Sequence, residues 1–315
     1  MANGAGAHLR SLADQQIANE KANIEQQIAA EHERRTLEHQ AKIKRFKLSK
    51  RNLEADALAA IVNPVTCLAM GDSWFDYPLN DYGIISSNQD ILAQLQNIGN
   101  PPPVILSHAV HGQSMAATMG LSNQGTYVSD LADENNWING KPDAILISGG
   151  GDDIAGDPLI IYLDYAGRGL SSRVQGVLAS IEASYQALFQ FRDVYIDPKT
   201  PIIGHCYDYA IPDGRGVFLL SGPWLKPSFD FAGYQNVATN QQTIKSVIDD
   251  LYAMFDGLQK DKNNNFILID TRGTLTADAT QPLGWANELH PYTAGFLALA
   301  QEFLKVLKKE FPGRV

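Results

Sequence analysis

From residue 61 onward, short apolar runs alternate with stretches whose apolar residues recur at helical spacing. Five runs have the length and composition of buried strands, at 65–70, 104–108, 143–148, 201–206 and 266–270. Helices are predicted between and after them, at 90–98, from 114, at 172–192, at 239–258 and at 293–309. Strands that are separated by helices pair in parallel. The pattern therefore predicts an α/β fold, a doubly wound five-stranded parallel sheet with helices on both faces.

The first 60 residues have a different pattern. Residues 12–45 are rich in Ala, Gln, Glu, Lys and Arg and contain no Pro or Gly, which predicts a long helix. Ile17, Ile24 and Ile28 fall on one face of it, but the apolar spacing then stops, so a sustained coiled coil is not predicted. We therefore expect a helical N-terminal arm at 1–60, followed by one domain at 61–315.

Charge is distributed unevenly between these two parts. The chain has a net charge of −10; its first 60 residues hold 10 Lys and Arg against 8 Asp and Glu, which leaves about −12 on the domain. The basic residues of the arm gather at 42–51, interleaved with Ile43, Phe46 and Leu48. Such a patch is most often a solvated helix face, and otherwise contacts an anionic membrane or a partner. The negative domain argues against a nucleic-acid binder.

Two further features bear on the compartment. Cys67 and Cys206 both stand in apolar runs, which suits buried thiols in a reducing environment better than a disulfide. No apolar run approaches the ~18 residues of a membrane span, and no signal peptide is visible at the N-terminus. These features predict a cytoplasmic location, with export by a signal-independent route left open.

Small and polar residues follow the predicted strands, at the end of the sheet where ligands bind in open α/β folds. They are Gly71-Asp72-Ser73 after the first strand, His111-Gly112 after the second, Gly151-Asp152 after the third and Asn287-Glu288-Leu289-His290 after the fifth. An isolated Gly-Asp-Ser would more often cap a helix. Four such segments on one rim can instead converge on a single site with a serine nucleophile.

These four blocks, in this order across residues 65–310, resemble the SGNH hydrolase (GDSL esterase/lipase) family. The resemblance implies a flavodoxin-like three-layer sandwich in which Ser73 is the nucleophile and His290 is its general base. It also implies an oxyanion hole made by the N–H groups of Ser73 and Gly112 and by the side chain of residue 152. No cofactor is implied. No metal is predicted either, because no His or Cys stands at ligand spacing beside Asp152-Asp153.

Two positions depart from the family pattern. Asp152 replaces a side-chain amide, and an ionised carboxylate cannot donate to an oxyanion. Either Asp152 is protonated, or backbone N–H groups substitute for it, or turnover is reduced. Asn287 replaces the acid of the triad; its oxygen can hold the imidazole tautomer but brings no charge. Glu288 and Asp270 are the alternative groups for orienting His290.

Rival motifs are present as well. Ser114 lies in a segment that resembles the Gly-x-Ser-x-Gly elbow of α/β-hydrolases, although a helix N-cap is the favoured interpretation. His108 and His111 stand three residues apart without a third ligand, so no metal is predicted there.

The predicted activity is hydrolysis of a small-molecule or lipid carboxylic ester through an acyl-enzyme on Ser73. The loop at 207–236 and the aromatic residues Trp74, Phe75 and Tyr77 are expected to supply an apolar acyl pocket. Two alternatives are an acetyl-polysaccharide esterase and a catalytically silent domain that binds partners through its arm. The substitutions at 152 and 287 motivate the second alternative.

Overall fold

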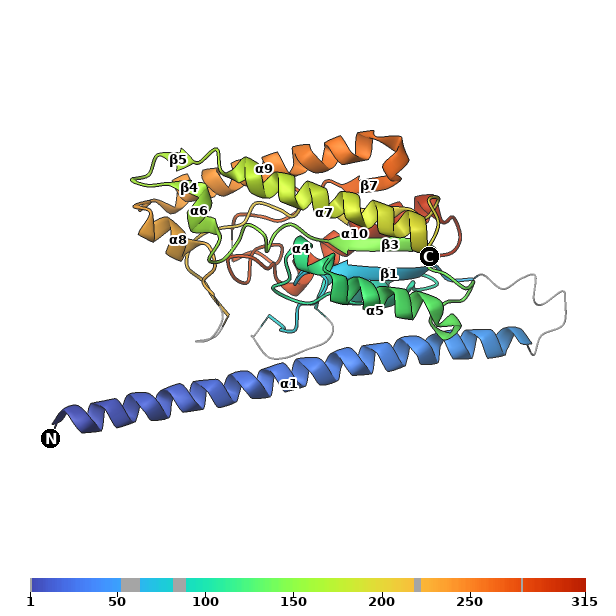
Figure 1. Ribbon diagram of the computed structural model, residues 1–315, viewed down its shortest axis with the longest axis horizontal. Helices are drawn as coiled ribbons and strands as arrows, with labels where there is room; N and C mark the ends of the chain where they lie inside the picture. The colour runs from blue at the N-terminus through green and yellow to red at the C-terminus, as the bar shows by residue number, and fades with distance from the viewer. Residues whose placement is uncertain (1, 52–62, 82–88, 218–221, 279) are drawn as a thin grey trace.

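The computed structural model describes residues 2–51, 63–81, 89–217, 222–278 and 280–315. Its centre is a five-stranded parallel sheet in the order β2-β1-β3-β6-β7, of which Figure 1 labels β1, β3 and β7. The strands are β1 (Thr66–Gly71), β2 (Val104–Ser107), β3 (Ala144–Ser148), β6 (Ile202–His205) and β7 (Phe266–Ile269). The five strands predicted from the apolar runs are therefore confirmed. In this flavodoxin-like order the winding reverses between β1 and β3, which opens a crevice there.

Helices cover both faces of the sheet and complete a three-layer sandwich. On one face α3 (Ile91–Ile98) packs against α10 (Thr293–Glu310). The other face carries α4 (Met115–Thr118), α5 (Leu121–Ala132), α7 (Val174–Tyr195) and α9 (Val237–Lys260) (Figure 1). Every residue of β1 and of β3 is buried. Because both faces of these strands are covered, they are continuously apolar rather than alternating.

Several short elements escaped prediction. The chain after the glycine run forms α6 (Leu159–Tyr162), β4 (Leu163–Asp164) and β5 (Gly169–Leu170), and the loop at 207–236 contains α8 (Lys226–Phe231). Two 3₁₀ turns, η1 (Glu134–Asn136) and η2 (Lys262–Asn264), follow α5 and α9. Elements this short do not complete the window over which hydrophobic periodicity is read.

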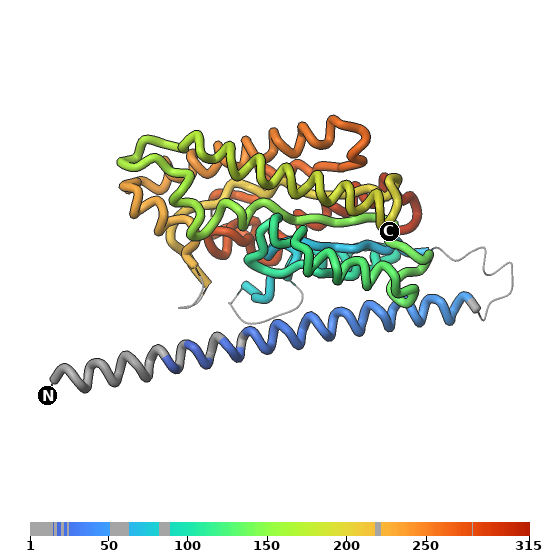
Figure 2. Tube along the Cα trace, viewed as in Figure 1, coloured from blue at the N-terminus to red at the C-terminus, as the bar shows by residue number. Residues whose placement is uncertain are grey.

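The arm forms one helix, α1 (Ala2–Arg51), longer at both ends than the predicted 12–45. It runs beside the domain (Figures 1 and 2) and contacts the edge strand β2. Ile43 is fully buried there, and His39 Nε2 lies 2.8 Å from the carbonyl oxygen of Asn136. An uncovered edge strand exposes unpaired backbone groups, and α1 covers this one. The predicted boundary at residue 60 and the side chains of Ile17 and Ile24 lie outside the described residues.

The basic patch of the arm contacts the domain through part of its length. Ile43 faces inward, Lys42 Nζ lies 3.1 Å from Gln96 Oε1, and Lys47 Nζ donates to the carbonyl of Glu134 over 2.5 Å. Leu48 stays exposed. The buried apolar residue of this patch is therefore used within the chain.

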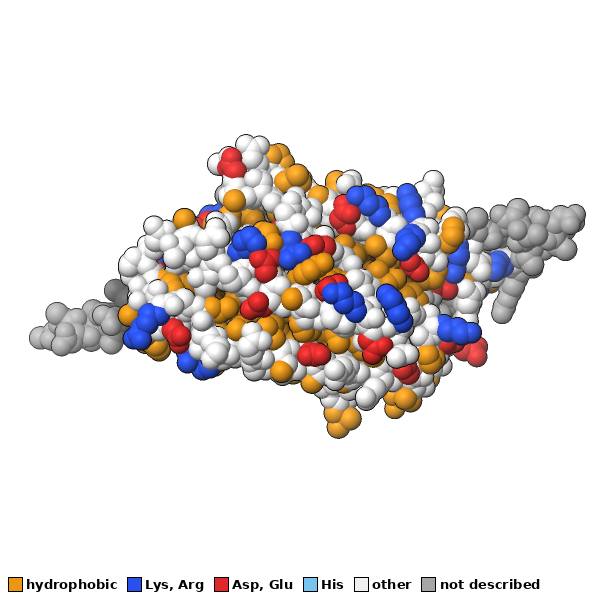
Figure 3. All heavy atoms as spheres, turned by 90° about the horizontal axis from the view of Figure 1, so that it is seen from above, with side chains coloured by type: hydrophobic (Ala, Val, Ile, Leu, Met, Phe, Trp, Pro, Cys, Tyr) orange, Lys and Arg blue, Asp and Glu red, His pale blue; other side chains and the backbone are white. Residues whose placement is uncertain are grey.

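The surface charges and the two cysteines can be compared with what the sequence predicts. On the face seen from above, basic and acidic side chains are interspersed (Figure 3). Cys67 and Cys206 are free and buried, and burial raises the pKa of both thiols. Among the described residues, no helix combines the length and the apolar character needed to cross a bilayer.

Candidate active site

Residues 71–76, called the nucleophile turn below, begin at the end of β1, beside the end of β3. Gly71 has φ +132°, and a Cβ there would lie 1.8 Å from the carbonyl oxygen of Ser148, so only glycine allows the two strand ends to approach so closely. The N–H of Asp72 donates to the same oxygen over 3.0 Å. Ser73 is therefore presented at the reversal point of the sheet, where a ligand crevice is expected.

Ser73 meets His290 across 217 residues of sequence. His290 Nε2 lies 2.7 Å from Ser73 Oγ, and both side chains are buried. The histidine stands in a loop before α10 that is closed by the bridge between Trp285 and Pro291. The indole N–H of Trp74 donates to the carbonyl of Leu289 over 3.1 Å and so joins this loop to the nucleophile turn. The hydrogen bond of Trp74 thus holds the loop that carries His290 against the turn that carries Ser73.

Asn287 determines which nitrogen of His290 carries the proton. Its Oδ1 accepts the backbone N–H groups of Leu289 (3.0 Å) and His290 (2.9 Å), and it also lies 3.0 Å from His290 Nδ1. Backbone N–H groups can only donate, so the amide atom that faces them is oxygen. Nδ1 must therefore donate as well, which leaves the lone pair of Nε2 facing the hydroxyl of Ser73.

Tyr77 supports this arrangement. Its ring stacks on the imidazole of His290 with centroids 4.4 Å apart, and its hydroxyl accepts the amide N–H of Asn287 over 3.0 Å. Burial, together with the charge of His111, lowers the pKa of His290 to about 3. The imidazole is therefore neutral at neutral pH, which is the state that a general base requires.

The two alternative partners for His290 are occupied elsewhere. Glu288 is fully buried, and its carboxylate accepts four backbone N–H groups of the loop at 207–236, those of Gly214, Trp224, Leu225 and Lys226, over 2.6–2.9 Å. Asp270 pairs with Arg272 at 2.8 Å. The expectation that either acid could orient His290 is therefore wrong. Glu288 instead fastens the loop at 207–236 to the histidine loop.

The backbone N–H groups of Ser73 and Gly112 are the donors expected for an oxyanion. In the described part of the chain, the N–H groups of Ser73 and Gly112 have no hydrogen-bond acceptor. Gly112 adopts φ +75°, a left-handed conformation that favours glycine. Apart from its two chain neighbours, no protein atom lies within 4 Å of the position that a Cβ would take there, so the space beside Gly112 is open.

Solved structures match this architecture. The lipase Lip_vut3 from a goat rumen metagenome shares 15% identity over 79% of this chain and 99% of its own, with a TM-score of 0.51. A catalytic mutant of the acetylxylan esterase Axe2 from Geobacillus stearothermophilus follows at 15% identity over 78% and 94%, with a TM-score of 0.41. A GDSL-like lipase from Bacteroides thetaiotaomicron shares 11% identity over 86% and 98%, with a TM-score of 0.38.

The chain has the SGNH hydrolase fold. Of these three superpositions, the one with Lip_vut3 carries this assignment, because its TM-score exceeds 0.5. No protein-family model and no curated protein matches the sequence. At identities this low the likeness shows the fold alone, so the chemistry has to be argued from the side chains of this chain.

In this SGNH hydrolase fold, residue 152 stands beside two other carboxyl groups. Asp152 follows the glycine run after β3, with Asp72 and Asp153 as its acidic neighbours. Burial, and then the charges of these two neighbours, raise the pKa of Asp152. A carboxyl group with a raised pKa keeps its proton and can donate an O–H. Asp152 therefore has an O–H donor while it is protonated.

A buried network lies behind the nucleophile. Asp72 accepts the hydroxyl of Ser148 at 2.6 Å and also that of Tyr207. The hydroxyl of Tyr207 in turn accepts the N–H of Gly151 at 3.0 Å. Tyr207 adopts φ +64°, which is uncommon for a residue with a side chain. Sequence reasoning missed Tyr207, whose hydroxyl connects the nucleophile turn to the glycine run that carries Asp152.

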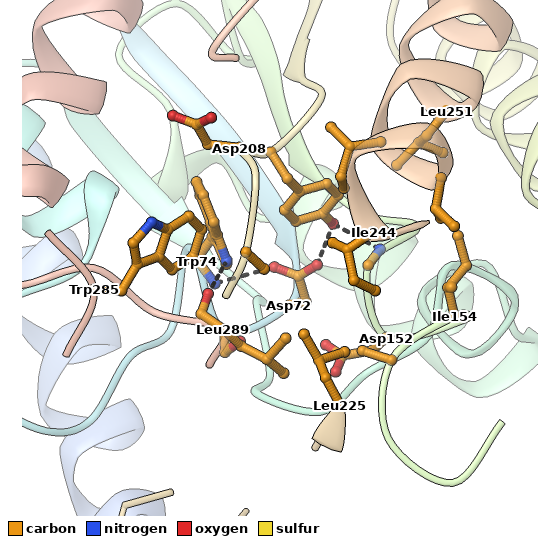
Figure 4. Close-up of a pocket in the computed structure, with 17 residues that line it drawn as sticks. Asp72, Trp74, Asp152, Ile154, Asp208, Leu225, Ile244, Leu251, Trp285 and Leu289 are labelled. Carbon is orange, nitrogen blue, oxygen red and sulfur yellow. Dashed lines mark hydrogen bonds between the residues drawn. The ribbon is translucent and has the colours of Figure 1, made fainter. Parts of the chain in front are cut away.

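An apolar cavity that opens to solvent begins at Ser73. Figure 4 shows the carboxyl groups of Asp72 and Asp152 among its mostly apolar lining. One wall is an apolar stripe of α9, made of Ile244, Val247, Ile248 and Leu251. This stripe has the i, i+3, i+4, i+7 spacing of a helix face, a signal that does not distinguish a pocket wall from the core.

The pocket residues expected from the sequence are partly wrong. Trp74 and Leu225 do line the cavity, but Phe75 packs in the core against Phe303, and Tyr77 stacks on His290. Within the loop at 207–236, the ring of Phe231 is exposed to solvent. Two other aromatic side chains of that loop, Phe229 and Tyr234, pack against each other in the core.

The rival motifs have other roles. Ser114 caps α4, accepting the N–H of Ala117 over 3.2 Å, as the N-cap interpretation predicted. His108 pairs with Asp130 at 2.7 Å, whereas His111 contacts Asp76 at 3.0 Å. The two histidines therefore face different carboxylates rather than a common centre.

Proposed function

We propose that this protein hydrolyses carboxylic esters through an acyl-enzyme on Ser73. The observation that carries the proposal is the contact of 2.7 Å between Ser73 Oγ and His290 Nε2, made while the oxygen of Asn287 holds the proton on Nδ1. A serine hydroxyl is a weak nucleophile until a positioned base takes its proton. The silent-domain alternative has no need of such an alignment.

The reaction follows from these positions. Ser73 Oγ attacks the ester carbonyl as its proton passes to His290 Nε2, and the carbonyl oxygen becomes an oxyanion. The N–H groups of Ser73 and Gly112 and the protonated carboxyl of Asp152 donate to that oxyanion. The C–O bond then breaks, and the imidazolium returns its proton to the leaving alcohol. Water activated by His290 releases the acid and restores the serine.

The cavity favours an ester with an apolar acyl group. Its lining beside Ser73 is largely aliphatic, including Ile244, Leu251 and Leu225. The neighbour Lip_vut3 is named a lipase, which accords with an acyl ester. Apolar walls of this kind bind a chain through the area removed from water, about 25 cal/mol per Å². The short acyl group of an acetyl-polysaccharide would leave most of these apolar walls without contact.

A p-nitrophenyl ester series from acetate to decanoate tests this function. We expect purified protein to hydrolyse the series, with kcat/KM rising beyond acetate because each buried CH₂ contributes about 0.8 kcal/mol. A fluorophosphonate probe should label Ser73, located by peptide mass spectrometry. A kcat/KM for the acetate ester far above that for all longer esters would support the acetyl esterase. The absence of both ester turnover and probe labelling would support the catalytically silent domain.

The protonated state of Asp152 predicts an alkaline limb in the rate profile. Because the pKa of Asp152 is raised, its O–H donor is present at neutral pH and is lost as pH rises through that pKa. Loss of one such donor lowers kcat by about 10²–10³. Asp152→Asn should keep activity at neutral pH and remove the limb, because an amide donates at every pH. Measurement of kcat from pH 6 to 10 checks this expectation.

Asp153→Asn is the matched control for that profile. Its carboxylate accepts the N–H of Met115 over 2.7 Å, and its charge raises the pKa of Asp152. The limb should therefore persist and move to lower pH. A limb that survives unchanged in Asp152→Asn would contradict the assignment of Asp152 as a donor.

A further inference from the structure

Asp76 stands three residues after Ser73 and is not part of the hydrolytic machinery described above. Its side chain is only 3% exposed, and in the described part of the chain it faces His111 of the domain and His32 and Arg35 of the arm. Burial would raise the pKa of Asp76, but hydrogen bonds from His111 and His32 and the charge of Arg35 hold it well below its usual range. A buried carboxylate that stays charged requires such partners.

The two oxygens of Asp76 serve two different parts of the chain. Oδ2 accepts the backbone N–H of His111 over 3.1 Å and contacts its Nδ1 at 3.0 Å. Oδ1 faces α1, where it lies 2.8 Å from His32 Nε2 and 3.4 Å from Arg35 Nη1. One carboxylate therefore connects the arm to the segment that precedes Gly112.

The segment 108–114, called the oxyanion loop below, is attached to β1 as well as to Asp76. Its first part is fastened to β1, since the N–H of His108 donates to Ala69 and that of Val110 donates to Gly71, over 2.8 and 2.9 Å. Past Val110, the contact of His111 with Asp76 is the next backbone attachment to the nucleophile turn. It immediately precedes Gly112, whose N–H is proposed to face the oxyanion.

The arm makes a second contact of the same kind. Arg35 Nη2 lies 3.4 Å from Asp90 Oδ2, and Asp90 is a fully buried N-cap of α3. His32 and Arg35 thus bring donors to two buried carboxylates of the domain. The net charges of the two parts, positive on the arm and negative on the domain, agree with this pairing. Four residues further along α1, His39 continues the contact at η1.

We propose that Asp76 is a positioning residue for the oxyanion loop and that His32 and Arg35 of the arm hold it in place. The arm thereby takes part in hydrolysis without contacting the substrate. This inference rests on the proposed function, because it concerns the placement of the Gly112 N–H. A donor that is displaced by about 1 Å can lower a rate by about 10²-fold, so a remote anchor can affect kcat.

The simpler alternative is that Asp76 only fastens the arm to the domain. The two interpretations differ in what they change. A fastening contact affects the unfolding temperature, whereas a positioning contact acts on the transition state and leaves ground-state binding unchanged. The comparison therefore needs kcat, KM and stability for each variant, measured in the full chain.

Three variants are compared with the wild type on the ester that it hydrolyses best. Asp76→Asn keeps the size of the side chain and removes its charge. The double variant His32→Leu with Arg35→Met removes both arm donors. The double variant Gln40→Met with Lys42→Met is the matched control, since it removes two polar contacts of the same helix, to Asn136 and Gln96, away from Asp76.

We expect Asp76→Asn to lower kcat about 10- to 100-fold with little change in KM. The arm variant should lower kcat about threefold or more, and the control should leave it unchanged. Affinity for an alkylboronic acid, which forms a tetrahedral adduct on a serine, should fall by the same factors as kcat. If Asp76→Asn does not fold, the arm variant and its control decide the question.

Two results would overturn the inference while the proposed function stands. One is wild-type kcat in Asp76→Asn with only a lower unfolding temperature, which would make Asp76 an anchor. The other is an arm variant indistinguishable from the control, which would remove the arm from hydrolysis. Absence of ester turnover and of Ser73 labelling in the wild type would instead refute the proposed function, and this inference with it.

Discussion

Ser73→Ala is expected to lower kcat for ester hydrolysis by roughly 10⁴- to 10⁶-fold, as loss of the nucleophile does in serine hydrolases. The contact of its hydroxyl with His290 is the hydrogen bond that this change removes. The backbone donors and the cavity would remain, so binding of the ester should be retained. Steady-state kinetics, with circular dichroism to verify folding, measure the loss.

Ser114→Ala is the matched control for this change. The hydroxyl of Ser114 caps α4, so its removal should cost about 1 kcal/mol of stability and leave kcat within about twofold of wild type. A fluorophosphonate should label the Ser114 variant at Ser73 and should not label Ser73→Ala. Labelling at Ser114 in the wild type would reverse the assignment of the nucleophile.

Asn287→Ala is expected to lower kcat by roughly 10²- to 10⁴-fold, the range seen when the third member of a triad is altered. The oxygen of Asn287 holds the Nδ1 proton of His290 and two backbone N–H groups. Without it, Nδ1 has no acceptor to maintain the tautomer that leaves Nε2 free for Ser73. Comparison of kcat for the variant and the wild type across pH measures the effect.

Asn287→Asp separates orientation from charge. A carboxylate keeps the three acceptor contacts, and the hydroxyl of Tyr77 can turn to donate to it. The pKa of His290 is lowered in the wild type, so the base stays neutral, and active, well into the acidic range. A neighbouring negative charge favours the imidazolium and raises that pKa. The acidic limb of kcat/KM should therefore move to higher pH, with kcat kept or raised.

Glu288→Gln and Asp270→Asn are the controls for position 287. Asp270→Asn should leave kcat and its pH profile unchanged, because that carboxylate pairs with Arg272. Glu288→Gln should loosen the loop at 207–236, with its effect on KM and stability rather than on the acidic limb. Wild-type activity in Asn287→Ala, together with an inactive Asp270→Asn, would show that the third member lies elsewhere.

Much of the fold could be predicted because a buried strand is visible in the sequence as a continuous apolar run. The run Thr66–Gly71 is apolar because both faces of β1 are covered, and the same holds for Ala144–Ser148 in β3. Parallel strands direct their carboxyl ends to one rim, so the sequence predicts that Ser73 and Gly112 lie at the same rim of the sheet. The pocket could not be predicted from the sequence, since the apolar stripe at Ile244 and Leu251 has the same spacing whether it faces a core or a ligand.

The parallel sheet, the helical arm and the candidacy of Ser73 and His290 can be predicted from the sequence, because they depend on periodicity and on residue types at strand ends. Which polar side chain contacts which donor depends instead on how distant segments pack. Asn287 and Glu288 are adjacent in the chain, yet one faces His290 and the other accepts the N–H groups of a distant loop. Asp76 meets His32 from 44 residues away. A hydrogen bond depends on distances of a few tenths of an ångström between segments far apart in sequence, and no local pattern records them.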